Sequence, residues 1–258
     1  MSALKQKLLK NSTIKETSVL TDSIIYNDKK EMATPVPMIN VALSGKLDGG
    51  LTSGFTMIAG PSRHFKTAFA LLLASAFLKK HGEEAMILFY DTEFGTPQSY
   101  ITSFGIDPTQ IIHTPITEVE ELKHDLMTQL QYIERGDKVL IMIDSIGNIA
   151  SKKEVEDAID GKVVADMTRA KALKSLFRMV TGKLNLKDIP LVGINHTYQT
   201  LEMYTKTIVG GGTGAMYAAD NVWIVGRQQE KTAKEGHTGY NFTINVEKSR
   251  YVLSLIHI

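Results

Sequence analysis

An apolar strand, a tight turn and an apolar helix follow one another in the first third of the chain. The pattern predicts a strand over 55–59 and a helix over 67–80 that packs through Phe69 and Phe77. The turn between them consists of Gly60, Pro61, Ser62, Arg63, His64, Phe65, Lys66 and Thr67. A glycine turn that opens a helix beside a lysine and a hydroxyl is typical of loops that surround phosphate groups.

The turn departs from the usual phosphate-loop pattern at one position. Phe65 stands where the pattern G-x-x-x-x-G-K-S/T has its second glycine, so its side chain must fit the loop without a clash. The turn alone therefore leaves two interpretations open. It is either a phosphate-binding loop or an ordinary strand–turn–helix connection in which Lys66 and Thr67 are adjacent by chance.

The rest of the chain alternates between apolar segments and amphipathic segments. Strands are expected at 85–90, 139–143, 191–194, 221–225 and 242–246, and helices at 119–135 and 164–180. The expected strands are apolar on both faces and helices lie between them. We therefore expect an α/β fold with a mostly parallel, twisted sheet that helices cover on both faces.

Composition limits the possible classes of protein. The 258 residues suffice for one large α/β domain, and the net charge of +1 means that any nucleic-acid site must be local. The chain has no cysteine, which excludes disulfides and fits a reducing cytosol. The apolar segments are too short for a signal peptide or a membrane span, so we expect a cytoplasmic protein with no membrane partner.

Two further expected strands end in acidic residues. Asp144 follows the strand 139–143, and Glu93 follows the strand 85–90. An acidic residue beside a phosphate loop can hold the hydration shell of Mg²⁺, and a second one can polarise an attacking water. Either residue alone is also compatible with an ordinary strand end or a solvated loop charge. Three strand ends with this chemistry, in this order, favour a nucleotide site.

Seven segments of the chain resemble those of the RecA recombinases, and in particular of the phage UvsX recombinases. They are Ala59–Thr67, Phe89–Gly95, Ile143–Lys153, Asp166–Lys171, Ile194–Tyr198, Gly210–Gly214 and Val246–Arg250. The resemblance extends over about residues 4–252 and implies a RecA-type P-loop ATPase core. It also implies a DNA-dependent ATPase that coats single-stranded DNA as a filament and promotes homologous strand exchange. Phe65 resembles a feature of the UvsX branch.

The resemblance implies ATP and Mg²⁺ as cofactors and assigns residues to them. Lys66 and Thr67 would bind the ATP phosphates and Mg²⁺, and Asp144 would hold Mg²⁺ through water. Glu93 would be the catalytic carboxylate. Tyr100 matches a tyrosine that stacks near the adenine.

Three more residues match positions that connect the nucleotide to its surroundings. His196 stands where RecA has a glutamine that senses the γ-phosphate and passes its presence to the adjacent loop. Lys248 and Arg250 match basic residues that reach the ATP of the neighbouring subunit. Without the resemblance, these two residues indicate a solvated basic strand end.

The resemblance places DNA at two segments that we expect to be loops, 151–163 and 197–212. Lysines and backbone N–H groups there can bind phosphates, and aromatic rings can stack on bases. The expected DNA contacts are Lys152, Lys153, Lys162, Arg169, Tyr198, Tyr204, Lys206, Gly210, Gly211 and Gly212. Without the resemblance, a surface loop and a solvated helix face are the preferred interpretation.

We expect three regions along the chain. Residues 1–34 form an arm with a short helix and the apolar triplet 24–26, which is either a strand added to a neighbour's sheet or a strand on its own core. Residues 35–252 form the ATPase core, which we expect to be truncated at its C-terminus. Residues 253–258 are a tail that departs from the family.

The implied partners are single-stranded DNA, homologous duplex DNA, further copies of the chain, a single-strand-binding protein and a loader or mediator. Two alternatives remain open. One is a hexameric helicase core, which shares the fold. The other is a recombination mediator or paralogue that binds nucleotide without hydrolysing it.

Overall fold

The computed structural model describes residues 2–27, 29–162, 167–200, 206–232 and 236–252. The chain divides into two compact units, Met1–Lys30 and Glu31–Ile258. Within the described residues, no helix has both the length and the apolar composition needed to cross a membrane.

Among its described residues, the first unit contains three short helical segments. They are α1 (Ala3–Lys10), η1 (Leu20–Asp22) and α2 (Ile24–Asn27). The Ser2 hydroxyl accepts a hydrogen bond from the Lys5 N–H and so caps the start of α1, which confirms the helix expected there. The expectation of a strand at 24–26 is wrong, because these residues form the helical turn α2. A helical turn satisfies backbone groups locally, whereas a strand needs a partner strand.

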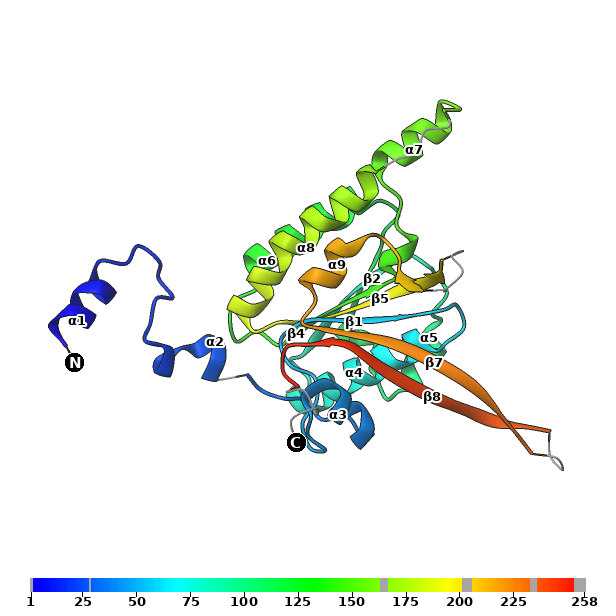
Figure 1. Cartoon of the computed structure of the whole chain (residues 1–258), viewed down its shortest axis with the longest axis horizontal. Coiled ribbons are helices and arrows are strands. Elements are labelled where there is room, and N and C mark those ends of the chain that lie inside the picture. Colours follow the sequence, from blue (N-terminus) through cyan, green and yellow to red (C-terminus); the bar gives the residue numbers. More distant parts are fainter. Residues whose placement is uncertain (1, 28, 163–166, 201–205, 233–235, 253–258) are drawn as a thin grey trace. The chain divides into compact units, whose positions relative to one another are not determined.

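The second unit is built on one eight-stranded sheet, among the residues that the structure describes (Figure 1). Its strands are β1 (Gly54–Gly60), β2 (Met86–Asp91), β3 (Ile111–Pro115), β4 (Val139–Asp144), β5 (Pro190–Gln199), β6 (Thr207–Val209), β7 (Asn221–Thr232) and β8 (Gly236–Ser249). The order is β3-β2-β4-β5-β1-β7-β8, with β6 paired to β5. All neighbours from β3 to β7 are parallel, and only β6 and β8 pair antiparallel. The expected mostly parallel sheet is confirmed.

Helices cover both faces of this sheet, as the α/β prediction requires. One apolar layer is shared with α3 (Pro37–Ser44), α4 (Lys66–His81) and α5 (Gln98–Thr102). The other is shared with α6 (Val119–Tyr132), α8 (Thr168–Lys187) and α9 (Thr213–Ala218). Phe55 of β1 stacks on Phe177 of α8 with their ring centroids 4.8 Å apart, which fixes α8 against the central strand.

The two expected DNA loops contain regular structure, so that part of the prediction is wrong. The segment 151–163 contains the helix α7 (Lys152–Ile159), which projects from the body of the unit in Figure 1. Ser151 and Glu154 form a capping box that starts this helix. The segment 197–212 contains the end of β5 and the strand β6, which pair as a hairpin.

The remaining boundaries differ by a few residues or more. The helix expected at 164–180 is observed as α8, and residues 163–166 lie outside the described residues. The strands β7 and β8 extend well beyond the expected 221–225 and 242–246, because they pair with each other past the edge of the parallel sheet. The short η2 (Pro108–Gln110) and η3 (Ile146–Asn148) follow α5 and β4.

Candidate functional site

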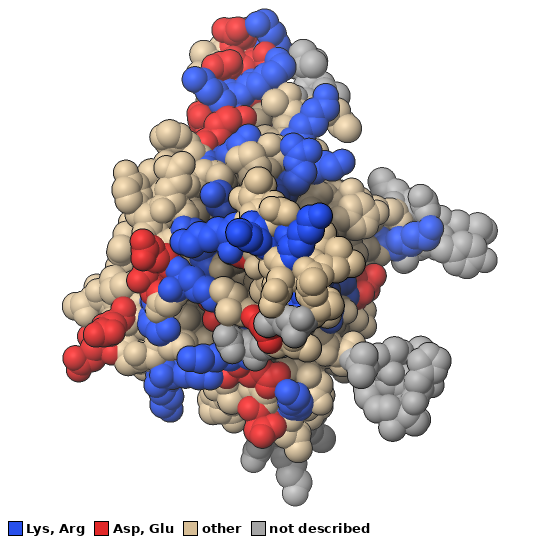
Figure 2. All heavy atoms as spheres, turned by 90° about the vertical axis from the view of Figure 1, so that its left-hand side faces the viewer, with Lys and Arg blue, Asp and Glu red and all other residues tan. Residues whose placement is uncertain are grey.

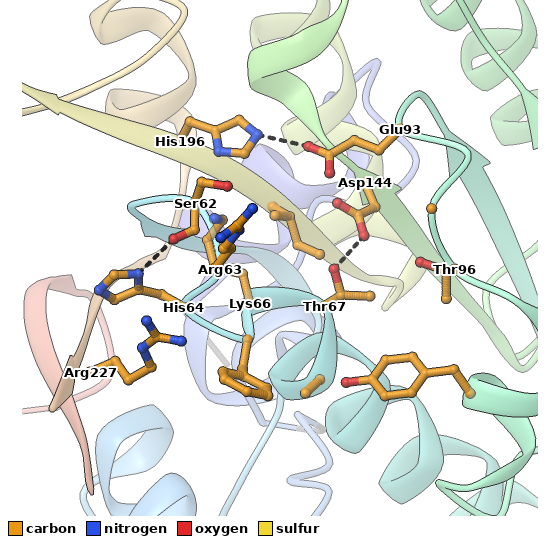
Figure 3. Close-up of a pocket in the computed structure, with 15 residues that line it drawn as sticks. Ser62, Arg63, His64, Lys66, Thr67, Glu93, Thr96, Asp144, His196 and Arg227 are labelled. Carbon is orange, nitrogen blue, oxygen red and sulfur yellow. Dashed lines mark hydrogen bonds and ion pairs between the residues drawn. The ribbon is translucent and has the colours of Figure 1, made fainter. Parts of the chain in front are cut away.

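A cleft of about 300 Å³ opens at the carboxyl ends of the parallel strands (Figure 3). Ligands of open parallel sheets bind at this edge, because loops and helix N-termini converge there. The lining residues are Ser62, Arg63, His64, Phe65, Lys66, Thr67, Ala68, Glu93, Gly95, Thr96, Tyr100, Asp144, Ile194, His196 and Arg227. The cleft therefore brings together most of the nucleotide residues that were expected from the sequence.

The turn 60–67 forms one wall of the cleft between β1 and α4. Phe65 has φ 56° and ψ 28°, and Arg63 has φ 62°, so both adopt the left-handed conformation. Glycine adopts this conformation without strain, whereas a residue with a Cβ does not. Phe65 thus keeps the backbone shape that the second glycine of the usual pattern provides.

The ammonium group of Lys66 points back into its own loop. Its Nζ donates a hydrogen bond to the Pro61 carbonyl at 2.8 Å, and the side chain is buried. Burial lowers the pKa of Lys66, while the negative charges of Glu93 and Asp144 act in the opposite direction. The Pro61 carbonyl is neutral, so the buried ammonium has no negatively charged hydrogen-bond partner there. A phosphate in place of the carbonyl would supply that negative charge.

Thr67 and Asp144 form the second polar contact of the cleft. The Thr67 hydroxyl donates to Oδ2 of Asp144 at 2.7 Å (Figure 3). Burial raises the pKa of Asp144 to about 6, with the charges of Glu93 and Asp91 acting in the same direction. A hydroxyl and a carboxylate at this separation are oxygen ligands of the kind that Mg²⁺ prefers beside nucleotide phosphates, so the residues fit that ion.

Glu93 lies across the cleft from Thr67 and accepts two hydrogen bonds on Oε1. The Ser145 hydroxyl donates at 2.7 Å, and Nε2 of His196 lies at 2.7 Å. Burial alone would raise the pKa of Glu93, but these two hydrogen bonds and the charges of His196 and Lys66 leave the pKa below its usual value. Glu93 is therefore ionised at neutral pH and held in one orientation.

Backbone and side-chain contacts fix the ends of β2 and β4 beside each other. The Thr92 hydroxyl donates to the Ser145 carbonyl at 2.9 Å and accepts from the Ser145 N–H at 2.8 Å. The buried carboxylate of Asp91 accepts from the N–H of Glu93 at 3.0 Å and from that of Phe94 at 2.8 Å. Its other oxygen lies 3.1 Å from Nε2 of His113, a contact that the sequence did not indicate.

His196 connects the cleft to the glycine segment that follows β6. It pairs in register with Gly60 at the end of β1, and its carbonyl accepts from the N–H of Gly210 at 2.8 Å. Asn195 completes the connection, because its side chain accepts from the His196 N–H at 2.8 Å and donates to the Gly210 carbonyl at 2.9 Å. Hydrogen bonds of the backbone and of Asn195 thus join the end of β5 to Gly210.

Other expected nucleotide residues lie around this centre. Tyr100 lines the cleft and packs edge-on against Phe104 with their centroids 5.3 Å apart. Gly60 forms the floor of the turn, where an added Cβ would approach the Val225 carbonyl to 2.9 Å. Nδ1 of the His64 ring lies 2.9 Å from the Ser62 carbonyl oxygen.

Lys248 and Arg250 lie at the opposite, amino edge of the sheet. Nζ of Lys248 donates to the Tyr217 carbonyl at 2.8 Å, and Nε of Arg250 lies 3.3 Å from the buried carboxylate of Asp220. Burial and the nearby Arg250 lower the pKa of Lys248. The structure thus separates these two residues from the cleft of their own chain.

The expected DNA residues of the first segment lie on and around α7. Lys153 pairs with Asp157 at 2.6 Å, and Lys162 pairs with Asp160 at 2.8 Å. Figure 2 shows basic and acidic side chains interspersed at the tip that α7 forms at its top. Arg169 differs from the lysines, because its guanidinium donates to the Gly147 carbonyl and the residue is partly buried. Lys152 remains at the first turn of the exposed helix.

The second expected DNA segment lies beyond the His196 end of β5. Tyr198 is 56% exposed, and Lys206 is exposed directly before β6. Gly211 and Gly212 have φ of 78° and 80°, and an added Cβ would approach Leu173 and Ala170 of α8. Tyr204 lies outside the described residues.

One cationic residue of the cleft was missed. Arg227 lies in β7, two residues beyond the expected end of that strand at Val225. Its guanidinium lies 4.7 Å from the ring centroid of Tyr240 and 5.9 Å from that of Phe65. A lone arginine after a strand carries no specific signal, so only a longer β7 would have brought it to notice.

The RecA N-terminal domain family matches residues 15–255 of this chain. The chain belongs to the RecA family. The observed sheet, with the turn 60–67 between β1 and α4, agrees with a RecA-family α/β core. The chain is also similar to the recombination and repair protein of Enterobacteria phage T4, with 52% identity over 252 residues. That match covers 98% of this chain and 64% of the T4 protein, so the chain spans less than two thirds of its relative.

Proposed function

We propose that this chain is an ATP-dependent DNA recombinase that forms a helical filament on single-stranded DNA and promotes homologous pairing and strand exchange. The observation that carries the proposal is the convergence of Lys66, Asp144 and Glu93 on one cleft, whose His196 is bonded to the glycine segment at Gly210. Membership in the RecA family supports it, as does the name of the T4 relative, recombination and repair protein.

ATP binding uses groups that the cleft already presents. Lys66 exchanges the Pro61 carbonyl for the terminal phosphates, and the N-terminus of α4 offers N–H groups to the same anion. Thr67 and Asp144 would hold Mg²⁺. When bound, Mg²⁺ neutralises charge on the phosphate oxygens. Tyr100 supplies an aromatic face at the side of the cleft where we assign the adenine.

Hydrolysis requires a water that is oriented toward the γ-phosphate. We assign this role to Glu93. Its contacts with the Ser145 hydroxyl and with Nε2 of His196 both use Oε1. We assign Oε2 to the attacking water, from which it accepts a proton as the phosphoryl group transfers. Lys66 stabilises the charge that develops on the transferred group.

Coupling to DNA runs through β5. A γ-phosphate offers His196 a partner that competes with Glu93, so the imidazole and its strand end take a second position. Because the His196 backbone is bonded to Gly210, this shift reaches the segment that we assign to DNA. We assign the DNA contacts to the exposed residues among 151–162, 197–200 and 206–212, together with Arg169 of α8.

The partners follow from this activity. Single-stranded and homologous duplex DNA are the substrates, further copies of the chain form the filament, and a single-strand-binding protein and a loader act with it. We assign Lys248 and Arg250 to the nucleotide of a neighbouring copy, as the resemblance implies. We place the activity in the cytoplasm of a host cell.

The test is DNA-stimulated release of phosphate from ATP, compared between the parent and Lys66→Ala. Lys66 is the P-loop cation, so its loss should abolish turnover and ATP-dependent strand exchange. Lys79→Ala is the matched control, since it removes an exposed lysine from the same helix. Unchanged turnover in Lys66→Ala would exclude this cleft as the site.

The same assay separates the alternatives. A mediator that binds nucleotide without hydrolysing it would bind ATP but release no phosphate; the presence of Glu93 in the cleft favours hydrolysis over this alternative. A helicase core would hydrolyse ATP and unwind a forked duplex without pairing homologous strands.

A further inference from the structure

Phe65 holds a backbone conformation that its side chain disfavours. It is the residue directly before α4, with φ 56° and ψ 28°. The left-handed region is a genuine outlier for a bulky residue, and such residues persist only where the surroundings hold them. The contacts of the Phe65 ring are surroundings that can hold this conformation.

The Phe65 ring lies within a cluster of aromatic rings. Its centroid is 5.3 Å from that of Tyr240 and 5.4 Å from that of Phe242, which it meets edge-on. The Arg227 guanidinium lies over both Tyr240 and Phe65. Tilted and edge-on ring pairs at this spacing, with a cation over their faces, are mutually attractive.

All of these partners come from one hairpin. Arg227 of β7 pairs in register with Phe242 of β8, and Tyr240 lies two residues from Phe242 on the same face of β8. Phe242 also meets Phe69, one turn further along α4, edge-on at 5.5 Å. The β7–β8 hairpin therefore packs against Phe65 in the turn 60–67 and against Phe69 in the first turn of α4.

We propose that Tyr240 and Phe242, together with Arg227, are positioning residues that clamp Phe65 in the left-handed conformation and so set the shape of the phosphate loop. The inference rests on the nucleotide binding proposed above. The N–H groups of the loop point at a phosphate only while this backbone shape is kept. In this chain, contacts from the hairpin replace the conformational freedom of a glycine.

Tyr240 is the member of the clamp that can be tested cleanly. Arg227 lines the cleft itself, and Phe242 also packs on Phe69. Tyr240 instead lines an apolar groove on the other side of Phe65, together with Phe69 and Ile244. Its removal changes the support of the loop rather than a group that faces the nucleotide.

The experiment is a double-mutant cycle on Mg²⁺-dependent binding of a fluorescent, hydrolysis-resistant ATP analogue without DNA. Tyr240→Leu should weaken binding by roughly five- to thirtyfold. This range is the free-energy cost of the left-handed conformation for a non-glycine residue, converted to a ratio of affinities. In a Phe65→Gly background, the same change should have almost no effect, because glycine needs no clamp. Tyr240→Phe keeps the ring and should restore binding.

A second comparison does not depend on the hairpin. Phe65→Ala and Phe65→Gly both remove the ring, but only alanine keeps the strain, so the glycine variant should bind the analogue more tightly. Tyr132→Leu is the matched control, because Tyr132 is an exposed tyrosine at the end of α6 on the other face of the sheet. Thermal melting without nucleotide should show that each variant is folded.

Two results would overturn the clamp. One is equal binding by the parent and Tyr240→Leu. The other is an equal loss in both backgrounds, which a general effect on folding would produce. If the parent itself does not bind the analogue, the proposed nucleotide function fails, and this inference fails with it.

Discussion

Nε2 of His196 lies 2.7 Å from Oε1 of Glu93, although 103 positions separate the two residues in the chain. Glu93 follows β2 and His196 belongs to β5, so the contact joins two strand ends that flank β4. The same histidine is bonded through its backbone to Gly210. One pair of side chains thus connects the proposed hydrolytic group to the proposed DNA segment.

Glu93→Gln should slow ATP hydrolysis by roughly 10²–10⁴-fold while leaving nucleotide binding largely intact. Glutamine keeps an oxygen that can accept from Ser145 but cannot take a proton from water. Single-turnover hydrolysis and analogue binding measure the two effects separately, with Glu84→Gln, an exposed acid before β2, as the control. Loss of binding with turnover per bound ATP retained would indicate a structural role for Glu93.

His196→Ala should leave basal ATP binding nearly unchanged and remove much of the mutual effect between ATP and single-stranded DNA. By linkage, ATP tightens DNA binding by the same factor by which DNA tightens ATP binding. The measurement is DNA affinity with a non-hydrolysable ATP analogue and with ADP, at one salt concentration. His124→Ala, an exposed histidine on α6, is the control. An unchanged ratio of the two affinities would make His196 a packing residue.

Asp144→Asn should stabilise the nucleotide-free protein at neutral pH while it abolishes hydrolysis. The pKa of Asp144 is raised from 3.8 to about 6 in the folded chain. Between these values the folded state holds a proton that the unfolded chain has lost, so stability of the parent falls as pH rises through this window. Above it, the ionised group costs up to about 3 kcal/mol, at about 1.4 kcal/mol per pKa unit.

Denaturant unfolding of the parent and Asp144→Asn from pH 4 to pH 8 checks this prediction. The stability difference should grow between about pH 4 and pH 6 and stay constant above that range. Asp137→Asn, a change in the loop before β4, is the control. A difference that did not change with pH would show that ionisation of Asp144 is not its cause.

His113→Ala should lower the rate of hydrolysis without changing nucleotide affinity. Oδ1 of Asp91 accepts from the N–H groups of Glu93 and Phe94, and Nε2 of His113 contacts Oδ2 of the same carboxylate. His113 therefore fixes the carboxylate that holds the turn containing Glu93. We expect the rate of hydrolysis to fall roughly three- to tenfold. This is less than the loss of about 10²-fold that a displacement of a catalytic group by about 1 Å causes. His113→Gln can still contact Asp91 and should recover most of the rate. Equal losses in both variants would contradict a positioning role.

The parallel core and the cleft could be predicted because both depend on local patterns. Apolar runs such as 139–143 are bounded by polar residues, and the strands that they predict end at Asp144 and near Glu93 at one sheet edge. The register of the sheet then brings Asp91 opposite Asp144. Apolar patterning predicts that these two strand ends share an edge of the sheet, but it does not predict the register.

Contacts between distant segments could not be predicted. The length of β7, and with it the place of Arg227, depends on pairing with β8. The bond from Arg169 to the Gly147 carbonyl depends on how α8 packs, and the sequence shows only a basic residue there. The helix α7 is a different case, because Ser151 and Glu154 have the spacing of a capping box and their signal was outweighed by the surrounding charges.

The distance between the two edges of the sheet has a consequence for assembly. Lys248 pairs with Val222 at the start of β7, whereas the cleft follows the far end of β1, a strand about 20 Å long at about 3.3 Å per residue. If Lys248 and Arg250 complete a nucleotide site, that site belongs to another copy. A row of n copies then contains n − 1 complete sites, and one terminal copy is always idle. Turnover per copy would rise with the length of the row and level off, so short rows are the least active.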